Sequence, residues 1–259
     1  MERRKGIRNF RWVLVNYKNI PMEKHDIRLC EERLPLQNKK ENETLEKYAY
    51  RKIKEALLER KLAPGTQLTE RSIQEAFGIG RTPIRSALHT LEAEGYVKII
   101  PNRGCSVIQS DKKETTDVYE LRLVLLQYAL ERGVDHYTVD DFKEFERIVD
   151  LERQAWADYD FQQYLDAVEE FYDLIIQKAD NNFLWSVYNP MKNRVRVLLT
   201  LYDDFYMKHR EKNKSLDYQP KIIEYIKKKD VESAVRLIRE LNYNIIEGMR
   251  FGVVPIGKL

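Results

Sequence analysis

The chain of 259 residues contains little cysteine, glycine and proline and lacks long hydrophobic runs, and each shortage excludes a class of protein. Its two cysteines, Cys30 and Cys105, are too few for the disulfide framework of a small secreted domain, so a reducing cytoplasm is the expected location. Ten glycines and eight prolines do not suit a β-rich fold with many tight turns. No apolar stretch approaches the roughly 18 residues of a membrane span. The basic N-terminus leads into only four apolar residues, where a secretory signal needs roughly 7–15, so we expect neither a membrane segment nor a signal peptide.

The charge that is present is distributed unevenly along the chain. Residues 1–45 and 46–110 each carry 11 basic and 7 acidic residues, whereas residues 111–259 carry 23 basic and 28 acidic residues. A basic first part joined to an acidic second part is typical of a polyanion-binding domain attached to one that does not touch the polyanion. A basic surplus of this size also occurs in ordinary domains that bind no polyanion. The charge alone therefore does not decide whether the first part binds one, and sequence motifs are needed.

Residues 1–44 have neither a helical nor a strand period over any length, and they end in the polar stretch 37–44. This pattern is typical of a flexible arm or linker. Met22 is an alternative start of the protein, in which case the first 21 residues would not belong to it. A second alternative is a basic arm that adds contacts with DNA phosphates.

Residues 45–110 begin with the pattern of two helices. Apolar residues at helical spacing predict a first helix over 45–61, which ends before the turn signal Ala63-Pro64-Gly65. Thr69 is suited to cap the N-terminus of a short second helix, whose apolar residues lie within 73–77.

A third helix and a hairpin follow. Gly78-Ile79-Gly80 predicts a tight turn, and the helix after it covers about 81–94. The β-branched runs 96–100 and 105–108 flank the turn residues 101–104, which is the pattern of a β-hairpin.

The order helix, helix, turn, helix, hairpin is that of a winged helix-turn-helix, whose third helix can lie in the major groove of DNA. The N-terminal end of this helix carries Arg81, Thr82 and Arg85. Arg81 and Arg85 are four residues apart and therefore share a helix face. Arginine is the side chain best shaped for bidentate contact with guanine or phosphate. Arg103 lies at the predicted hairpin tip, where it would meet the DNA backbone or the minor groove. The alternative for each of these four residues is a solvated surface position without a role in DNA binding.

From residue 117 onward, nearly every segment has apolar residues three and four apart, which is typical of helices. The predicted helices cover about 117–134, 140–157, 160–179, 183–208, 218–228 and 230–249. Six helices in about 140 residues make an all-α bundle. The expected fold class is therefore mainly α, with a winged helix-turn-helix domain at 45–110 followed by a helical domain at 111–259.

Three short motifs lie in order within residues 48–108: Ala63-Pro64-Gly65, Arg81-Thr82-Pro83-Ile84-Arg85 and Pro101-Asn102-Arg103-Gly104. With these motifs the segment resembles the GntR family of bacterial transcription regulators. The resemblance implies that DNA is contacted by Arg71, Arg81, Thr82, Arg85 and Gly104. Gly80 stands where serine is common in the family, which would remove one phosphate contact or part of a helix cap.

Residues 117–245 contain a more scattered set of short motifs, namely Glu120-Leu121-Arg122, Asn182 and Asp230-x-x-x-Ala234. In these the second domain resembles the FadR-like subfamily, whose ligand-sensing domain is called FCD. The resemblance implies a domain that binds a small organic effector and holds a homodimer together.

Many members of this subfamily bind a metal ion through one aspartate and three histidines. The equivalent positions in this chain are Val168, Tyr172, Gln219 and Leu241, which are not an ordinary set of transition-metal ligands. None of the four histidines lies at these positions, so we expect no such metal and no cofactor. A shift of the alignment by one turn could bring Asp166 or Glu169 to the pocket without adding a histidine.

Without a metal, the effector would be bound by other groups. Arg122 matches the pocket arginine of the family and could hold a carboxylate or phosphate. Tyr172 and Gln219 would supply hydrogen-bonding groups in place of metal ligands, and Arg194 flanks the apolar stripe of its helix. We therefore expect a small organic anion as the effector. The alternative is that Tyr172 only fills the vacated space and Arg122 forms a structural ion pair.

Together these patterns predict a sequence-specific DNA-binding transcription regulator, most simply a repressor, that acts as a homodimer on an inverted-repeat operator in double-stranded DNA. One alternative is a regulator whose second domain has lost its ligand and serves only for dimerisation. Another is an enzyme built on a helical bundle, but we find no phosphate-binding loop, metal spacing or catalytic triad to support it. We expect no catalytic residue.

Overall fold

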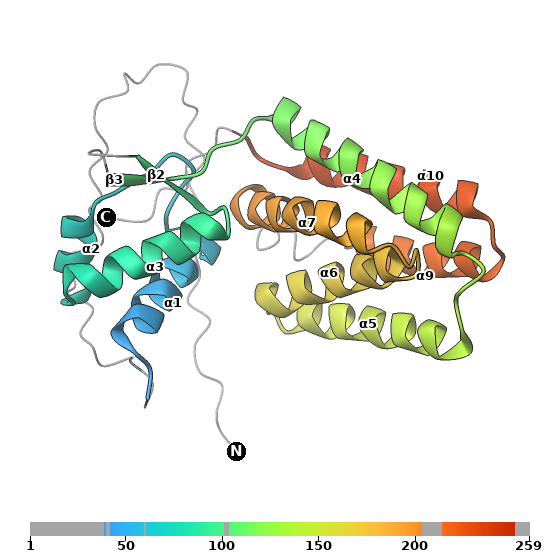
Figure 1. Ribbon diagram of the computed structural model, residues 1–259, viewed down its shortest axis with the longest axis horizontal. Helices are drawn as coiled ribbons and strands as arrows, with labels where there is room; N and C mark the ends of the chain where they lie inside the picture. Colours follow the sequence, from blue (N-terminus) through green and yellow to red (C-terminus); the bar gives the residue numbers. More distant parts are fainter. Residues whose placement is uncertain (1–38, 40–41, 60, 101–103, 204–213, 252–259) are drawn as a thin grey trace.

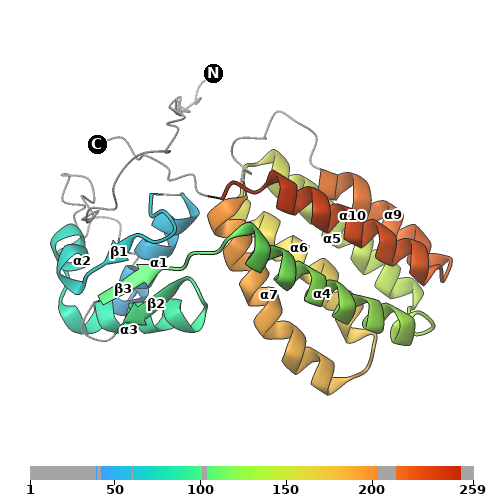
Figure 2. The ribbon, with the colours of Figure 1, turned by 90° about the horizontal axis from the view of Figure 1, so that it is seen from above.

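The computed structural model describes residues 39, 42–59, 61–100, 104–203 and 214–251. Figures 1 and 2 show a smaller domain of helices and a small sheet beside a larger domain made of helices alone. The expected N-terminal arm, residues 1–44, falls almost entirely outside the described residues. Among the described helices, none is long and apolar enough to cross a membrane.

The smaller domain has the predicted order of elements and one additional strand. Its elements are α1 (Leu45–Leu58), β1 (Gln67–Leu68), α2 (Glu70–Phe77), α3 (Arg81–Ala93), β2 (Val97–Ile100) and β3 (Gly104–Val107). The three strands form an antiparallel sheet in the order β1-β3-β2. A strand of two residues cannot show a period of two, which is why β1 could not be predicted from the sequence.

Local chemistry fixes the ends of these helices. The Thr69 hydroxyl accepts a hydrogen bond from the Ser72 N–H, and the Ser72 hydroxyl accepts one from the Thr69 N–H. This reciprocal capping box starts α2 at the predicted residue. At Gly80, by contrast, no side chain caps α3, as the missing serine led us to expect.

The larger domain consists of helices throughout its described residues. They are α4 (Lys112–Gly133), α5 (Val139–Ala157), α6 (Phe161–Gln177), α7 (Asn182–Tyr202), α9 (Lys214–Lys227) and α10 (Val231–Gly248). Helix α4 starts five residues before the expected 117, because the Asp111 carboxylate accepts a hydrogen bond from the Glu114 N–H and caps it. Helix α7 ends at Tyr202, since Asp203 after it is extended, and residues 204–208 of the predicted helix lie outside the described residues.

Two hydrophobic clusters fill the molecule. One lies within the helical bundle and takes residues from each of its helices α4, α5, α6, α7, α9 and α10. The other contains the core of the smaller domain and also the C-terminal half of α7, from Val195 to Tyr202. This second cluster is therefore shared by the two domains. Helix α7 contributes more residues to it than any other helix of the bundle.

The end of α7 also carries the polar contacts of this junction. The Ser110 N–H, in the segment between β3 and α4, donates a hydrogen bond of 2.8 Å to the Tyr202 hydroxyl. The Arg250 N–H, just after α10, donates one of 3.0 Å to the Tyr202 carbonyl. Tyr202 thus joins α7 both to the segment that leads out of the sheet and to the segment after the last helix.

Candidate DNA-binding surface and effector site

Helix α3 presents its predicted DNA-contacting residues to solvent. Four apolar residues on its inner face are buried in the core: Ile84, Ala87, Leu88 and Leu91. Arg81, Thr82 and Arg85 are all exposed on the opposite side of the helix. Because no side chain caps α3, its first N–H groups are open to an anion such as a DNA phosphate.

Arg85 is held by an acidic residue of the neighbouring helix. Its Nε lies 2.9 Å from Oε1 of Glu70 at the start of α2, and its second guanidinium nitrogen donates a bond of 3.2 Å to Oε2. This bidentate pair, with the nearby charge of Arg81, lowers the pKa of the Glu70 carboxyl. Glu70 could not be predicted from the sequence as a partner of Arg85, because the pair joins residues 15 positions apart that only the helix-turn-helix geometry brings together.

Arg71 and Gly104 have structural roles of their own. The Arg71 guanidinium pairs at 2.8 Å with Glu75 one turn further along α2, and both side chains are exposed. Gly104 starts β3 with a φ of +81°, and a Cβ there would lie 3.0 Å from the carbonyl oxygen of Leu68. Arg103, the residue predicted at the wing tip, lies outside the described residues.

Arg122 is buried inside the helical domain. Only 4% of its surface is exposed, and one terminal nitrogen donates a bond of 2.9 Å to Oδ1 of Asn242 in α10. Its guanidinium carbon lies 4.8 Å from the centre of the Tyr119 ring and 4.6 Å from that of Tyr172. Within the described part of the chain, no carboxylate forms an ion pair with it. Among the described residues Arg122 is therefore a buried cation held by neutral groups, which does not favour the alternative of a structural ion pair.

A small cavity adjoins this arginine between α4, α6 and α7. Its walls include Arg122, Val168 and Tyr172, so two of the four family metal positions line it, with an apolar and an aromatic side chain. The free space is about 10 Å³, which is close to room for a single water molecule. An organic effector could enter only if the surrounding helices moved apart.

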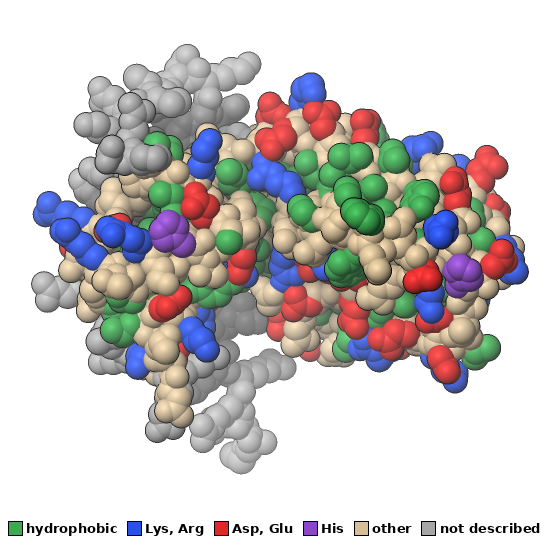
Figure 3. Space-filling view, viewed as in Figure 1, with side chains coloured by type: hydrophobic (Ala, Val, Ile, Leu, Met, Phe, Trp, Pro, Cys, Tyr) green, Lys and Arg blue, Asp and Glu red, His purple; other side chains and the backbone are tan. Residues whose placement is uncertain are grey.

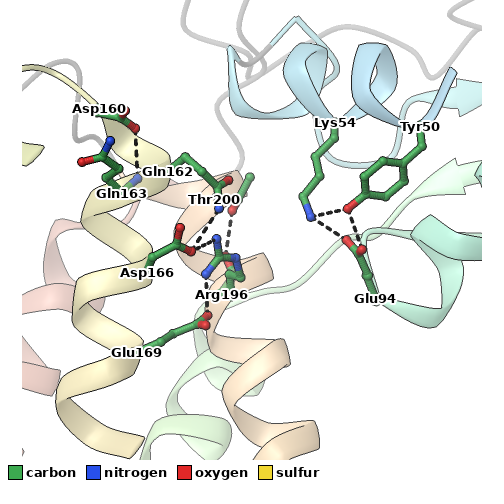
Figure 4. A network of polar contacts seen from close by, with 10 residues as sticks. All are labelled: Tyr50, Lys54, Glu94, Asp160, Gln162, Gln163, Asp166, Glu169, Arg196 and Thr200. Atoms are coloured by element: carbon green, nitrogen blue, oxygen red, sulfur yellow. Dashed lines mark hydrogen bonds and ion pairs between the residues drawn. The ribbon is translucent and has the colours of Figure 1, made fainter. Parts of the chain in front are cut away.

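The other charged groups beside the cavity are paired. Arg196 of α7 lies 2.7 Å from Asp166 and 2.9 Å from Glu169, both of α6, as Figure 4 shows. Lys192 pairs at 2.7 Å with Asp173. The two residues that an alignment shift would bring in, Asp166 and Glu169, are thus partners of Arg196. Arg122 remains the cation of this wall without an acidic partner among the described residues.

Two of the predicted effector residues do not line this cavity. Arg194 pairs with Glu114 of α4 instead, on a different side of α7. Gln219 of α9 is fully buried, and its amide lies close enough to the Glu152 carboxyl of α5 to act on the pKa of that group. The structure therefore brings Arg122 and Tyr172 together, leaves Arg194 apart and places Gln219 in another part of the interior.

No group of three or more potential metal ligands occurs in the described ranges. At the family positions, Val168 and Leu241 offer no donor atom, and Tyr172 and Gln219 offer neutral oxygen and nitrogen atoms. These side chains do not fit a site built from one aspartate and three histidines.

Comparison with protein families agrees with this arrangement. The model of bacterial regulatory proteins of the gntR family matches residues 45–107, and the FCD domain model matches residues 117–243. The chain belongs to the GntR family of transcription regulators. Its helical domain is an FCD domain, as expected for the FadR-like subfamily.

Relatives of this GntR-family regulator are about a quarter identical to it over the aligned part of the chain. The HTH-type transcriptional regulator YdhC of Bacillus subtilis is 23% identical over 71% of this chain and 82% of its own. The gluconate operon transcriptional repressor of Bacillus licheniformis is 26% identical over 71% of this chain and 76% of its own. Among solved structures, Lar of Listeria monocytogenes aligns with a TM-score of 0.59 at 20% identity, over 81% of this chain and 98% of that one. This last likeness supports the fold alone.

Proposed function

We propose that this GntR-family regulator is a homodimeric repressor that reads an inverted-repeat operator and responds to a small organic anion. The observation that supports operator reading is the exposed face of α3, where Arg81, Thr82 and Arg85 stand opposite the buried stripe. A helix with this arrangement can enter the major groove and offer arginine to guanine edges and phosphates. The names of two relatives, the gluconate operon repressor and the repressor RspR of Escherichia coli, support repression.

The partner in the homodimer would bind an apolar surface on the helical domain. Leu121, Val124 and Tyr128 of α4 and Phe183 and Val187 of α7 are all large, hydrophobic and exposed. Figure 3 shows hydrophobic side chains gathered over these two helices. A patch of this kind on an otherwise charged surface is typical of an interaction site. A second copy is the occupant we propose, because an inverted repeat needs two recognition helices related by a twofold axis.

The dimer is tested by measuring molar mass in solution. Val124→Glu places a charge in the centre of the patch and should convert the dimer to a monomer. Val139→Glu makes the same change at an exposed residue at the start of α5, outside the patch, and should leave the dimer intact. A dimeric Val124→Glu protein would show that the subunits associate elsewhere.

The route from effector to DNA would be α7. The middle of this helix supplies Tyr188, Lys192 and Val195 to the cavity beside Arg122, and its C-terminal part, from Val195 to Tyr202, lies in the core shared with the smaller domain. A ligand that widens the cavity must displace α7 or its neighbours and thereby shift the smaller domain. This supports a change in the spacing of the two recognition helices on ligand binding.

The size of the cavity favours a second candidate, a regulator that dimerises without sensing a ligand. A cavity with space for a single water molecule is expected of a regulator that binds no ligand. It is equally expected of a ligand-sensing regulator in its closed, ligand-free state. A thermal-shift screen of organic acids and acyl cofactors separates them, since a ligand at 100 times its Kd adds roughly 2.7 kcal/mol of stability. No stabilisation by any of these compounds would favour the version without a ligand.

Operator binding is tested by fluorescence anisotropy on DNA from upstream of the gene, at two salt concentrations and with unrelated DNA as competitor. Arg85→Ala should weaken specific binding by roughly 1–3 kcal/mol. Arg153→Ala, which removes an exposed arginine of α5 in the helical domain, is the matched control and should bind like the wild type. If Arg85→Ala also binds like the wild type, α3 is not the recognition helix.

A further inference from the structure

A groove on the surface of the helical domain lies between α4 and α10. The two helices are antiparallel, since Lys112 at the start of α4 pairs at 2.6 Å with Glu247 near the end of α10. The C-terminal half of α4 therefore lies beside the N-terminal half of α10. The free space of the groove there is about 460 Å³, which is within the usual range of small-molecule sites. We call it the α4–α10 groove.

Charged side chains of both signs line the α4–α10 groove. Its lining residues include Gln127 and Glu131 of α4 and Glu232, Val235, Arg236 and Arg239 of α10. The two glutamates and the two arginines are all exposed, whereas Val235 is buried beneath them. The groove therefore offers two negative and two positive groups to a molecule that enters it from solvent.

These four charged groups do not pair with one another. The side chains of Glu232 and Arg239 have no hydrogen-bond or ion-pair partner in the described part of the chain. Arg236 donates a bond of 3.0 Å to the Ser233 hydroxyl, and Glu131 accepts one of 2.8 Å from the Gln127 amide. By contrast, every arginine of α5 and α7 forms an ion pair: Arg147, Arg153, Arg194 and Arg196. The charges of the groove are thus available to a ligand.

The negative and positive groups lie at different ends of the groove. Along α10, Arg236 follows Glu232 by about 6 Å and Arg239 follows it by about 10 Å, at the rise of a helix. Glu131 lies at the Glu232 end, because α4 is antiparallel to α10 and Glu131 is close to its C-terminus. A ligand with charge of one sign would be attracted at one end of the groove and repelled at the other. A ligand with both signs would be attracted at both ends.

We propose that the α4–α10 groove is a second ligand site and binds a small zwitterion whose two charges are well separated. Its carboxylate pairs with Arg236 and Arg239, and its ammonium group pairs with Glu131 and Glu232. The spacing along α10 favours an ω-amino acid over an α-amino acid, whose two charged groups are adjacent. A metal ion is unsuitable, since the described residues bring no third ligand to the two glutamates.

This site does not depend on the cavity beside Arg122. The two share no lining residue, and the groove is already large enough for a ligand without any movement of the helices. The groove also requires no effect on DNA binding. The inference therefore goes beyond the proposed function and can fail or hold independently of it.

The test uses probes that share one carbon chain. In 6-aminohexanoate the charged groups are separated by six bonds, or about 7 Å when extended. Its isomer 2-aminohexanoate places them side by side, hexanoate lacks the ammonium group, and hexylamine lacks the carboxylate. Dissociation constants for the full-length protein are measured by calorimetry at low salt, where exposed charges are least screened. We expect 6-aminohexanoate to bind roughly 3- to 5-fold more tightly than each of the other three, as suits exposed ion pairs.

Two double variants then assign each end of the ligand. Glu131→Gln with Glu232→Gln should remove the advantage of 6-aminohexanoate over hexanoate and keep its advantage over hexylamine. Arg236→Gln with Arg239→Gln should do the reverse. Because all four side chains are exposed, these variants should fold like the wild type. The matched control is Glu146→Gln with Arg153→Gln, which removes one exposed charge of each sign from α5 and should keep both preferences.

Three results would overturn the second site. They are equal or absent binding of 6-aminohexanoate and its isomer, preferences that persist unchanged in both double variants, and a changed molar mass of either double variant. The last result would assign the groove to a contact between subunits. Operator binding is measured on the same preparations by anisotropy. A protein that fails the ligand test but binds its operator leaves the proposed regulator intact, whereas loss of operator binding by the wild type counts against that function alone.

Discussion

The buried carboxyl group of Glu152 should make the stability of this protein depend on pH. Burial raises its pKa from 4.5 to about 7 in the folded chain, and the unfolded chain keeps the ordinary value. Since the raised pKa belongs to the folded state, the full stability is present below about pH 4.5 and is lost as the pH rises through 7. A difference of about 2.5 pKa units corresponds to about 3 kcal/mol.

Thermal unfolding of the wild type and of Glu152→Gln between pH 4.5 and pH 8 measures this effect. The variant cannot ionise, so the wild type should lose about 3 kcal/mol relative to it across that range, or roughly 6–12 °C in Tm. The difference between the two proteins is the useful quantity, because carboxyls with lowered pKa, such as those of Glu70 and Asp141, act in the opposite direction in both. Glu146→Gln is the control on the same helix. Parallel pH profiles for wild type and Glu152→Gln would refute the reasoning.

Three other changes test the smaller domain. Glu70→Gln releases Arg85 from its ion pair and should strengthen operator binding, by no more than about 5-fold because the pair is largely exposed; unchanged affinity would mean that DNA does not compete with Glu70. Gly104→Ala should lower stability by about 1 kcal/mol or more, since it combines a positive φ with a contact of 3.0 Å to Leu68, and chemical denaturation would show it. Burial raises the pKa of the Cys105 thiol to about 12. In a Cys30→Ser protein, Cys105 should therefore react with a thiol reagent only after unfolding. Rapid reaction of the native protein would contradict the buried position of Cys105 in β3.

The fold could be predicted well because its signals are local. Thr69 predicts the start of α2 through a cap that involves neighbouring residues alone, and the apolar stripe of α3 predicts which face is buried. The start of α4 was placed too late, since its first turn contains charged residues and threonine but no apolar stripe, and the cap at Asp111 decides its position. Strand β1 depends on pairing with β3 about 40 residues away and leaves no periodic signal.

The candidate sites were less accessible to prediction, because their contacts join distant parts of the chain. The exposure of Arg81 and Arg85 follows from helical spacing, but the pairing of Arg85 with Glu70 does not. Glu152 looks like any other acidic residue of a charged helix until the fold places it against α9. Arg194 is the opposite case, since its place beside an apolar stripe predicts a position in the pocket, whereas its side chain pairs with Glu114.

The two hydrogen bonds at Tyr202 have a genetic consequence. This residue joins the end of α7, the helix through which we propose the effector acts, to the segment between β3 and α4, yet it belongs neither to α3 nor to the cavity beside Arg122. Tyr202→Phe removes the bond to the Ser110 N–H and leaves both surfaces intact. Such an allele should encode a protein that binds operator and effector normally but no longer transmits one event to the other. In a cell carrying it, the regulated genes would stay off when the inducer is supplied, a non-inducible phenotype that maps to neither binding site.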